Sequence, residues 1–242
     1  MGEIAFHSLP DGRRIAFRHN PGAGPALVFL PGYMSDMDGG KATAVMAWAQ
    51  ERGRECLLLD YSGCGRSEGD FADGTLTRWR DEVLALIEAQ VRGPVVLIGS
   101  SMGGWLMLLV AERLGNRLHA LVGIAAAPDF TDWGRSDEDK EKLSAGETVF
   151  DPNPYGREPT PMHPGFWADA QASGRLDGEI ALDCPVRLIH GMEDEDVPWE
   201  VSQRLCHALR SRDIQLIFVK DGDHRLSREQ DIALLLRTIA PI

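Results

Sequence analysis

Short apolar runs that alternate with segments of helical period are the feature that most constrains how this 242-residue chain can fold. Apolar runs of this length between turn residues are typical of buried strands, and the intervening segments repeat apolar residues at the spacing of an amphipathic helix. Strands separated in this way predict a parallel sheet with helices packed on its faces. The predicted parallel strands cover residues 27–30, 56–59, 95–98, 121–124, 186–189 and 214–219.

Two further strands are expected before this series. Residues 4–9 and 13–19 flank Pro10-Asp11-Gly12, a turn sequence that predicts an antiparallel hairpin at the edge of the sheet. Helical faces are expected over residues 42–49, 76–87 and 232–239. The sequence therefore predicts an α/β fold with an eight-stranded, mostly parallel sheet and flanking helices.

The regular alternation is interrupted between about residues 128 and 183. Prolines, glycines and charged residues replace the apolar period there, and isolated aromatic residues are scattered among them. A long irregular segment inside a compact domain is usually a lid or a binding segment. We therefore expect a single domain over residues 1–242, with residues 128–183 inserted as a small lid over the sheet.

Composition limits the partners of the chain. The 37 acidic residues outnumber the 25 basic ones, and the resulting net charge of -12 disfavours binding to nucleic acid or to anionic lipid. No apolar stretch approaches the length of a membrane span, and Glu3 interrupts any signal at the N-terminus. The four cysteines show no CxxC pairing and are expected to be reduced thiols. These features predict a cytoplasmic protein that acts on a small-molecule or acylated substrate.

A candidate nucleophile follows the predicted strand at 95–98. Gly99-Ser100-Ser101-Met102-Gly103 matches the GxSxG nucleophile elbow, and a predicted helix over 105–113 gives the motif its required strand-turn-helix context. In such a turn the serine is exposed above the carboxyl edge of the sheet. The simpler reading of the motif is a glycine-serine turn without chemistry. Its context favours Ser101 as a nucleophile.

A serine hydroxyl needs a base within hydrogen-bond reach, and this architecture supplies one from beyond the last strand. His224 stands there, whereas His190, at the end of a strand beside Gly191, is expected to be a packing histidine. An acid is also needed to orient the imidazole. The stretch from 190 to 198 offers Asp194 and Asp196 for that role.

An acyl-transfer site also needs donors for the developing oxyanion. The backbone N–H of Met102, directly after the candidate nucleophile, is the usual first donor. The second is expected from the loop after the first parallel strand, where Leu30-Pro31-Gly32-Tyr33 stands. Proline has no N–H. The N–H of Tyr33 is therefore the natural candidate.

Neither a cofactor nor a metal ion is expected. Residues 60–69 superficially resemble a dinucleotide-binding loop, but the third glycine is one residue late and the next helical segment begins only near Leu76. No helix N-terminus would then stand ready to hold a pyrophosphate. No cysteine, histidine and carboxylate spacing resembles a zinc site, and no glycine-rich loop carries the lysine of a P-loop.

Together these stretches resemble the α/β-hydrolase superfamily over essentially the whole chain. The resemblance rests on Leu30-Pro31-Gly32, residues 60–67, Gly99 to Gly103, the HGxxDxxVP stretch from His190 to Pro198, and Asp223-His224. The stretches 31–37, 60–63, 99–107 and 197–199 look like the mitochondrial α/β-hydrolase-domain branch of acyl-protein thioesterases and acyl-glucuronide esterases. The resemblance implies the triad Ser101, Asp194 and His224, with an oxyanion hole at Tyr33 and Met102.

The expected function is that of a serine hydrolase that cleaves acyl esters or thioesters through an acyl-enzyme. A small-molecule carboxylesterase or lactonase with the same triad is the alternative within the class, and a non-catalytic binding protein on a hydrolase scaffold is the alternative outside it. Aromatic residues of the insertion could contact the substrate or only anchor the lid. We expect substrate contacts from Trp133, Phe166 and Trp167. The insertion also carries Phe130, Phe150 and Tyr155.

Overall fold

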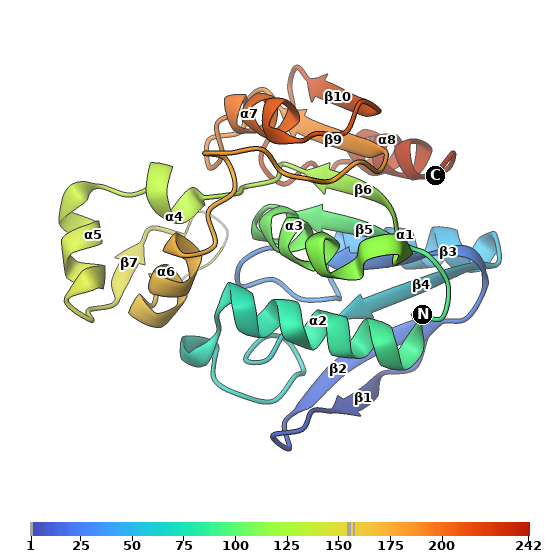
Figure 1. The fold of residues 1–242 in the computed structure, drawn as a ribbon, viewed down its shortest axis with the longest axis horizontal. Coiled ribbons are helices and arrows are strands. Elements are labelled where there is room, and N and C mark those ends of the chain that lie inside the picture. The colour runs from blue at the N-terminus through green and yellow to red at the C-terminus, as the bar shows by residue number, and fades with distance from the viewer. Residues whose placement is uncertain (1, 154–155, 157) are drawn as a thin grey trace.

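The computed structural model describes residues 2–153, 156 and 158–242, and an eight-stranded sheet forms its centre (Figure 1). Along the sheet the strands follow the order β1-β2-β4-β3-β5-β6-β9-β10. β2 pairs antiparallel with both β1 and β4, and the remaining neighbours are parallel. The predicted α/β class, the mostly parallel sheet and the hairpin at its edge are confirmed. The strands are β1 (Ala5–Ser8), β2 (Arg14–Asn20), β3 (Ala23–Leu30), β4 (Arg54–Leu59), β5 (Val95–Ser100), β6 (Leu118–Ile124), β9 (Val186–Gly191) and β10 (Ile214–Val219).

Helices cover both faces of this sheet (Figure 1). One face packs against α1 (Gly40–Glu51) and α8 (Glu229–Ile239). The other packs against α2 (Leu76–Gln90), α3 (Met102–Leu114) and α7 (Glu200–Ala208). Because α3 lies between the sheet and α2, nearly all its side chains are buried, which explains its apolar sequence on every side. The helix begins at Met102, three residues before the predicted start.

The insertion between β6 and β9 forms a separate lobe beyond one end of the central strands, at the left of Figure 1. Its two strands pair with each other and not with the main sheet. Each element is too short to leave a clear periodic pattern in the sequence. The described elements are α4 (Phe130–Trp133), α5 (Asp137–Ser144), β7 (Val149–Asp151), β8 (Thr160–Met162) and α6 (Pro164–Gln171).

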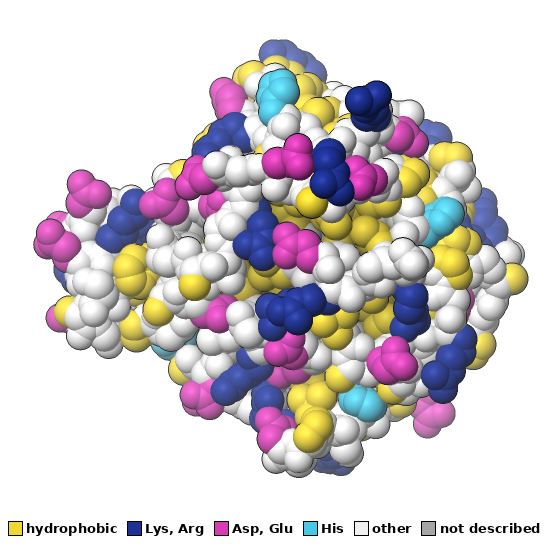
Figure 2. Space-filling model, viewed as in Figure 1, with side chains coloured by type: hydrophobic (Ala, Val, Ile, Leu, Met, Phe, Trp, Pro, Cys, Tyr) yellow, Lys and Arg dark blue, Asp and Glu magenta, His cyan; other side chains and the backbone are white. Residues whose placement is uncertain are grey.

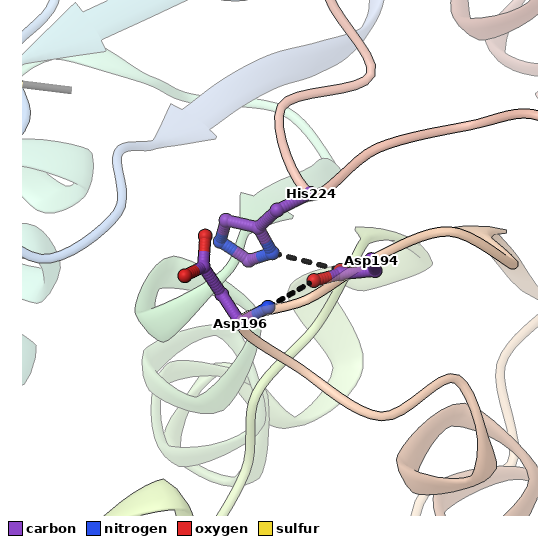
Figure 3. Close-up of side chains that lie close together, drawn as sticks. All are labelled: Asp194, Asp196 and His224. Atoms are coloured by element: carbon purple, nitrogen blue, oxygen red, sulfur yellow. Dashed lines mark hydrogen bonds and ion pairs between the residues drawn. The ribbon is translucent and has the colours of Figure 1, made fainter. Parts of the chain in front are cut away.

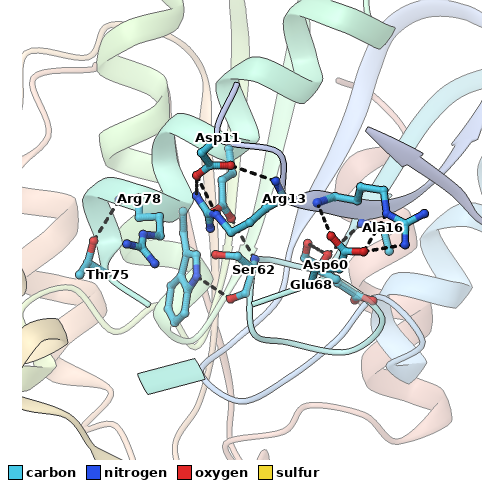
Figure 4. Close-up of polar contacts among 12 residues, drawn as sticks. Asp11, Arg13, Ala16, Asp60, Ser62, Glu68, Thr75 and Arg78 are labelled. Atoms are coloured by element: carbon cyan, nitrogen blue, oxygen red, sulfur yellow. Dashed lines mark hydrogen bonds and ion pairs between the residues drawn. The ribbon is translucent and has the colours of Figure 1, made fainter. Parts of the chain in front are cut away.

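The loop after β4, residues 60–69, is fixed by polar contacts rather than by regular structure (Figure 4). It includes no helix; the 3₁₀ turn η1 (Phe71–Asp73) follows it. The Ser62 N–H donates to the buried Glu82 of α2 over 2.9 Å, and Glu82 also pairs with Arg13 of the hairpin at 2.8 Å. Glu68 accepts a hydrogen bond from Arg14 at 2.6 Å. The loop is therefore tied to both the edge hairpin and α2.

Charged side chains of both signs are interspersed over the face of the molecule shown in Figure 2. Within the described residues, no helix has both the length and the apolar character needed to cross a bilayer. The four cysteines are free thiols, and Cys56 and Cys64 are buried.

Candidate active site

Ser101 lies at the tight turn between β5 and α3. Its φ of 54° and ψ of −122° belong to a region that non-glycine residues rarely adopt. Such backbone strain is held by the surrounding structure and is typical of functional sites. The turn also packs closely on β3, because a Cβ atom added at Gly103 would lie 2.1 Å from the Leu30 carbonyl oxygen. The strain and the close packing aim the Ser101 side chain into a cavity at the sheet edge.

The loops after β9 and β10 bring an acid and an imidazole to this serine. His224 Nε2 lies 3.0 Å from Ser101 Oγ, and His224 Nδ1 lies 2.8 Å from Asp194 Oδ2. Figure 3 shows the second of these contacts, with both side chains coming from loops at the same edge of the sheet. The structure thus brings together Ser101, His224 and Asp194, three residues that lie far apart in the sequence.

Asp196 occupies a different position from Asp194. Its carboxylate stands on the opposite side of the His224 ring, and its backbone N–H donates to Asp194 Oδ1 over 2.9 Å (Figure 3). Ligand atoms of Asp194, Asp196 and His224 lie within 4.8 Å of one another. A cation held by all three would displace the hydrogen bond between His224 and Asp194. Asp194 is thus the carboxylate that is hydrogen-bonded to His224 Nδ1, with Asp196 on the other side of the ring.

The Asp194 carboxylate has a side chain with 0% exposure. Burial raises the pKa of this group, but hydrogen bonds from His190, His224 and the Val197 N–H outweigh burial and hold the pKa below its ordinary range. Asp194 is therefore ionised at neutral pH. An ionised carboxylate stabilises the charged form of an imidazole to which it is hydrogen-bonded.

The two expected oxyanion donors both border the same cavity. Tyr33 and Met102 are among its lining residues, along with Ser101. Met102 is the first residue of α3, and the N–H at that position has no acceptor within its own helix. In the described part of the chain, the Tyr33 N–H also has no hydrogen-bond acceptor. Both N–H groups are thus available to an oxygen atom placed near Ser101.

The cavity around Ser101 has a volume of about 510 Å³. We call it the main cavity. Its wall includes Trp133, for which a substrate contact remains a prediction, together with Phe130 and Met162. Arg135 is another lining residue, but its guanidinium pairs with Asp151 at 2.7 Å. The insertion therefore contributes a partly aromatic wall to the site.

Phe166 and Trp167 do not reach the main cavity, which corrects our expectation for these two residues. Phe166 is 1% exposed, with its ring 4.9 Å from that of Tyr33 and 5.6 Å from that of Trp79. Trp167 is partly buried against the same core. Both side chains pack against the core and fasten the insertion to it, so they face inward rather than toward the main cavity. Tyr155 lies outside the described residues.

Strand β8 separates the main cavity from a second one of about 370 Å³. Thr160 and Met162 line the main cavity, whereas Pro161 and His163 line the second. This follows from the alternation of side chains along a strand. The Tyr33 hydroxyl donates to the Pro161 carbonyl over 2.9 Å, which holds the strand against the loop after β3.

Two further residues brace the site, and sequence reasoning identified neither. The buried Asp60 accepts hydrogen bonds from the N–H groups of Met37, at 2.7 Å, and Arg66, at 2.9 Å, and so fixes the far end of the loop that carries Tyr33. Burial raises the pKa of Asp60, and the two N–H donors oppose the rise. The signal in the sequence was an aspartate directly after a buried strand.

Lys41 lines the main cavity, and its ammonium group donates to the carbonyl of Arg225, the residue after His224. Burial, with a smaller contribution from Arg225, lowers the pKa of Lys41 to about 8. A cation in the first turn of a helix is unfavourable for the helix dipole, which was the available sequence signal for a special role.

Residues 27–237 match the model of the alpha/beta hydrolase family. The chain belongs to this family. It is 36% identical over 240 residues to the human protein named "Palmitoyl-protein thioesterase ABHD10, mitochondrial", which covers 98% of this chain and 78% of that protein. The structure of mouse alpha/beta hydrolase domain-containing protein 10 superimposes with a TM-score of 0.92 at 34% identity, covering 99% of this chain and 98% of the other. A structure from Agrobacterium vitis S4 matches with the same TM-score at 35% identity and the same coverage.

These matches confirm the resemblance drawn from the motifs, and the chain is an alpha/beta hydrolase. They also correct one expectation. A cytoplasmic location was expected from composition and from the first residues, but five mammalian relatives are named as mitochondrial proteins. The expectation of a cytoplasmic protein is therefore wrong. The overall charge of a chain does not indicate the cellular compartment in which the protein is found.

Proposed function

We propose that this hydrolase cleaves acyl thioesters or esters, with Ser101 as nucleophile, His224 as general base and Asp194 as the orienting acid. The observation that carries the proposal is the continuous hydrogen-bonded path from Ser101 Oγ to His224 Nε2, at 3.0 Å, and from His224 Nδ1 to Asp194, at 2.8 Å. A nucleophile, a base and an orienting carboxylate in this arrangement are the requirements of acyl transfer.

In the proposed mechanism, His224 takes the Ser101 proton as Oγ bonds to the acyl carbon. The carbonyl oxygen becomes an oxyanion and accepts hydrogen bonds from the N–H groups of Tyr33 and Met102. The bond to sulfur or oxygen then breaks, and His224 gives its proton to the leaving thiol or alcohol. Water attacks the acyl-Ser101 ester by the same steps and releases the acid, so the chain's own residues carry every proton.

The acyl group is assigned as an apolar chain of medium length or longer. Phe130, Trp133 and Met162 supply an apolar wall beside Ser101, and a relative is named as a palmitoyl-protein thioesterase. Arg135 does not require an anionic ligand, because Asp151 pairs with it. In this proposal residues 128–183 are the lid of a single domain that spans residues 1–242.

The nucleophile is tested with a fluorophosphonate probe and with steady-state kinetics. Ser101→Ala is expected to abolish labelling and to lower kcat by about a million-fold, because members of a triad act as a unit. Ser100→Ala, at the neighbouring serine, is the matched control and should still label. The expected residual activity of Ser101→Ala is far below about one per cent of wild type, so activity above that level would contradict the assignment. A wild-type protein that the probe does not label would support a non-catalytic binding protein.

The acid is tested with a pair of isosteric changes. Asp194→Asn should lower kcat by about 10⁴-fold, because the amide cannot hold the required tautomer of His224. Asp196→Asn, two residues away, should retain most of the activity. A larger loss from Asp196→Asn would transfer the role to that residue.

The acyl chain is tested with a series of thioesters and esters from acetyl to palmitoyl. Each methylene that enters the cavity should improve kcat/KM by up to about 0.8 kcal/mol until the cavity is full. Trp133→Ala should flatten the series, whereas Trp199→Ala, on a ring that packs against Phe218 outside the cavity, should leave it unchanged. A maximum at acetyl, or a preference for lactones, would favour the small-molecule carboxylesterase or lactonase.

A further inference from the structure

His190 stands behind the proposed triad, at the end of β9, and its side chain is 0% exposed. A buried imidazole needs hydrogen-bond partners on both nitrogens. Nδ1 lies 2.6 Å from Ser202 Oγ on α7, and Nε2 lies 3.1 Å from Asp194 Oδ2 and 3.0 Å from the Val197 carbonyl oxygen. His190 is thus a second histidine on the carboxylate that orients His224.

The partners of His190 determine where its proton lies. Nε2 faces a carboxylate oxygen and a carbonyl oxygen, and both of these can only accept. Nε2 therefore carries a hydrogen and donates it. Nδ1 faces the Ser202 hydroxyl, which can either donate or accept. In the neutral and in the charged form alike, His190 is a donor to Asp194.

With this contact, both oxygens of Asp194 have two donors each. Oδ2 accepts from His224, at 2.8 Å, and from His190, while Oδ1 accepts from the N–H groups of Asp196, at 2.9 Å, and Val197, at 2.8 Å. Four donors fix the plane of the carboxylate. They also spread its negative charge, of which only a part is directed at His224.

We propose that His190 is a positioning residue that holds the Asp194 carboxylate against His224 and limits the charge that Asp194 directs to it. This inference rests on the proposed function of Ser101, His224 and Asp194. His190 itself touches no substrate, because it is fully buried and does not line the main cavity. It acts on the reaction through the carboxylate.

The ionisable groups around the contact between His190 and Asp194 come from the loop after β9, the loop after β10 and helix α1. Asp194 and His224 face it directly, and Asp196 lies beyond the His224 ring. Lys41 and Arg225 lie at the cavity wall next to His224. Helix α7 contributes the Ser202 hydroxyl, and β10 places the uncharged Phe218 opposite His190 in the sheet. Asp194 and His224 are thus the pair through which a change at His190 reaches the pH dependence.

Two substitutions of His190 separate positioning from packing. In His190→Gln the amide nitrogen falls where Nε2 was and can still donate to Asp194. In His190→Asn the amide nitrogen falls where Nδ1 was, so Asp194 loses a donor while Ser202 retains a partner. We expect His190→Asn to lower kcat by about 10- to 100-fold, as outer contacts of a site do, with KM within about twofold.

The pH profile of kcat/KM gives the decisive readout. With one donor fewer, Asp194 directs more negative charge to His224 and stabilises its protonated form, so the acid limb should move to higher pH by about half a unit or more in His190→Asn. His190→Gln and Ser202→Ala, which both keep a donor on Asp194, should retain the wild-type limb.

A folded His190→Asn with an unmoved acid limb, or with a limb moved to lower pH, would overturn the role of His190, as would equal shifts in the Asn and Gln variants. If His190→Asn does not fold, a shifted limb in His190→Gln or Ser202→Ala overturns it instead. Fluorophosphonate labelling of Ser101 in each variant tells this failure from a failure of the proposed function. The wild type would remain unlabelled only in the second case.

Discussion

The segment from β5 through α3 is buried along almost its whole length, whereas α5 and β7 of the insertion bury one residue each, Leu143 and Val149. Figure 2 shows Asp and Glu side chains at the tip of the lobe that the insertion forms. The proposed nucleophile therefore lies on a segment that is constrained by its neighbours along almost its whole length, whereas the proposed substrate wall lies on a segment held by a few buried residues. Sequence changes should be costly in the first segment and cheap in most of the second.

A glycine-to-alanine substitution should give the largest difference in stability between the β5–α3 segment and the insertion. Gly103→Ala places a Cβ atom 2.1 Å from the Leu30 oxygen and 2.5 Å from the Pro31 oxygen, both of them backbone atoms. We expect a loss of at least about 4 kcal/mol in the free energy of unfolding. Gly165→Ala, in α6, meets nothing within 4 Å and should change stability by about 0.5 kcal/mol or less. Denaturant unfolding measures both, and similar losses would remove the contrast.

The exception within the insertion is its aromatic anchor. Phe166→Ala should cost about 3–5 kcal/mol, because a fully buried ring leaves a cavity among Tyr33, Trp79 and Phe130. Phe150→Ala is the matched control, since this ring of the same insertion is 62% exposed. Thermal unfolding followed by circular dichroism distinguishes the two. A cost below about 1 kcal/mol for Phe166→Ala, far under the usual range, would mean that the lobe is held in another way.

Backbone strain at Ser101 offers a smaller effect of opposite sign. Ser101→Gly relieves the unfavourable φ of 54°, so we expect it to be more stable than Ser101→Ala by about 1 kcal/mol. The comparison uses two inactive variants, which keeps loss of activity out of the measurement. Equal midpoints in denaturant for the two would show that the turn stores no strain.

The surface of the lobe should be the most tolerant part of the molecule. Glu138 and Lys142 form an ion pair on α5 between side chains that are 76% and 45% exposed. Ion pairs between such exposed side chains contribute little to the free energy of unfolding. Glu138→Ala should leave the unfolding midpoint and the acyl-chain series as in the wild type. A change in the acyl-chain series would place α5 closer to the substrate than the main cavity does.

Much of the fold could be predicted because the main sheet obeys simple periodicity. The strand predicted at residues 214–219 coincides with β10, and the predicted strand at 95–98 falls within β5. β3 starts at Ala23, four residues before the predicted start, because Ala23 already pairs with Arg54 of β4 although the small residues at the start of the strand leave no apolar pattern. The order of the strands in the sheet could not be predicted, because the apolar pattern of one strand does not indicate which other strand it pairs with.

The candidate site was less predictable, for a physical reason. Ser101 and His224 follow from their places after strands, but the contact between His190 and Asp194 depends on how a loop folds back over the end of β9. The sequence does not distinguish a histidine that only packs in the core from one that donates a hydrogen bond to a carboxylate of the site. Phe166 and Trp133 are equally aromatic, and only the orientations of α6 and α4 decide which of them faces the main cavity.

Tyr33 joins the two regions through three of its parts. Tyr33 lines the main cavity, its ring packs on Phe166, and its hydroxyl donates to Pro161 of β8. Under the proposed mechanism, a displacement of β8 is transmitted along one side chain to a donor of the oxyanion hole. The acyl chain would then affect kcat as well as KM. An acyl chain that fits without moving β8 leaves the oxyanion hole intact, whereas one that displaces β8 slows its own hydrolysis.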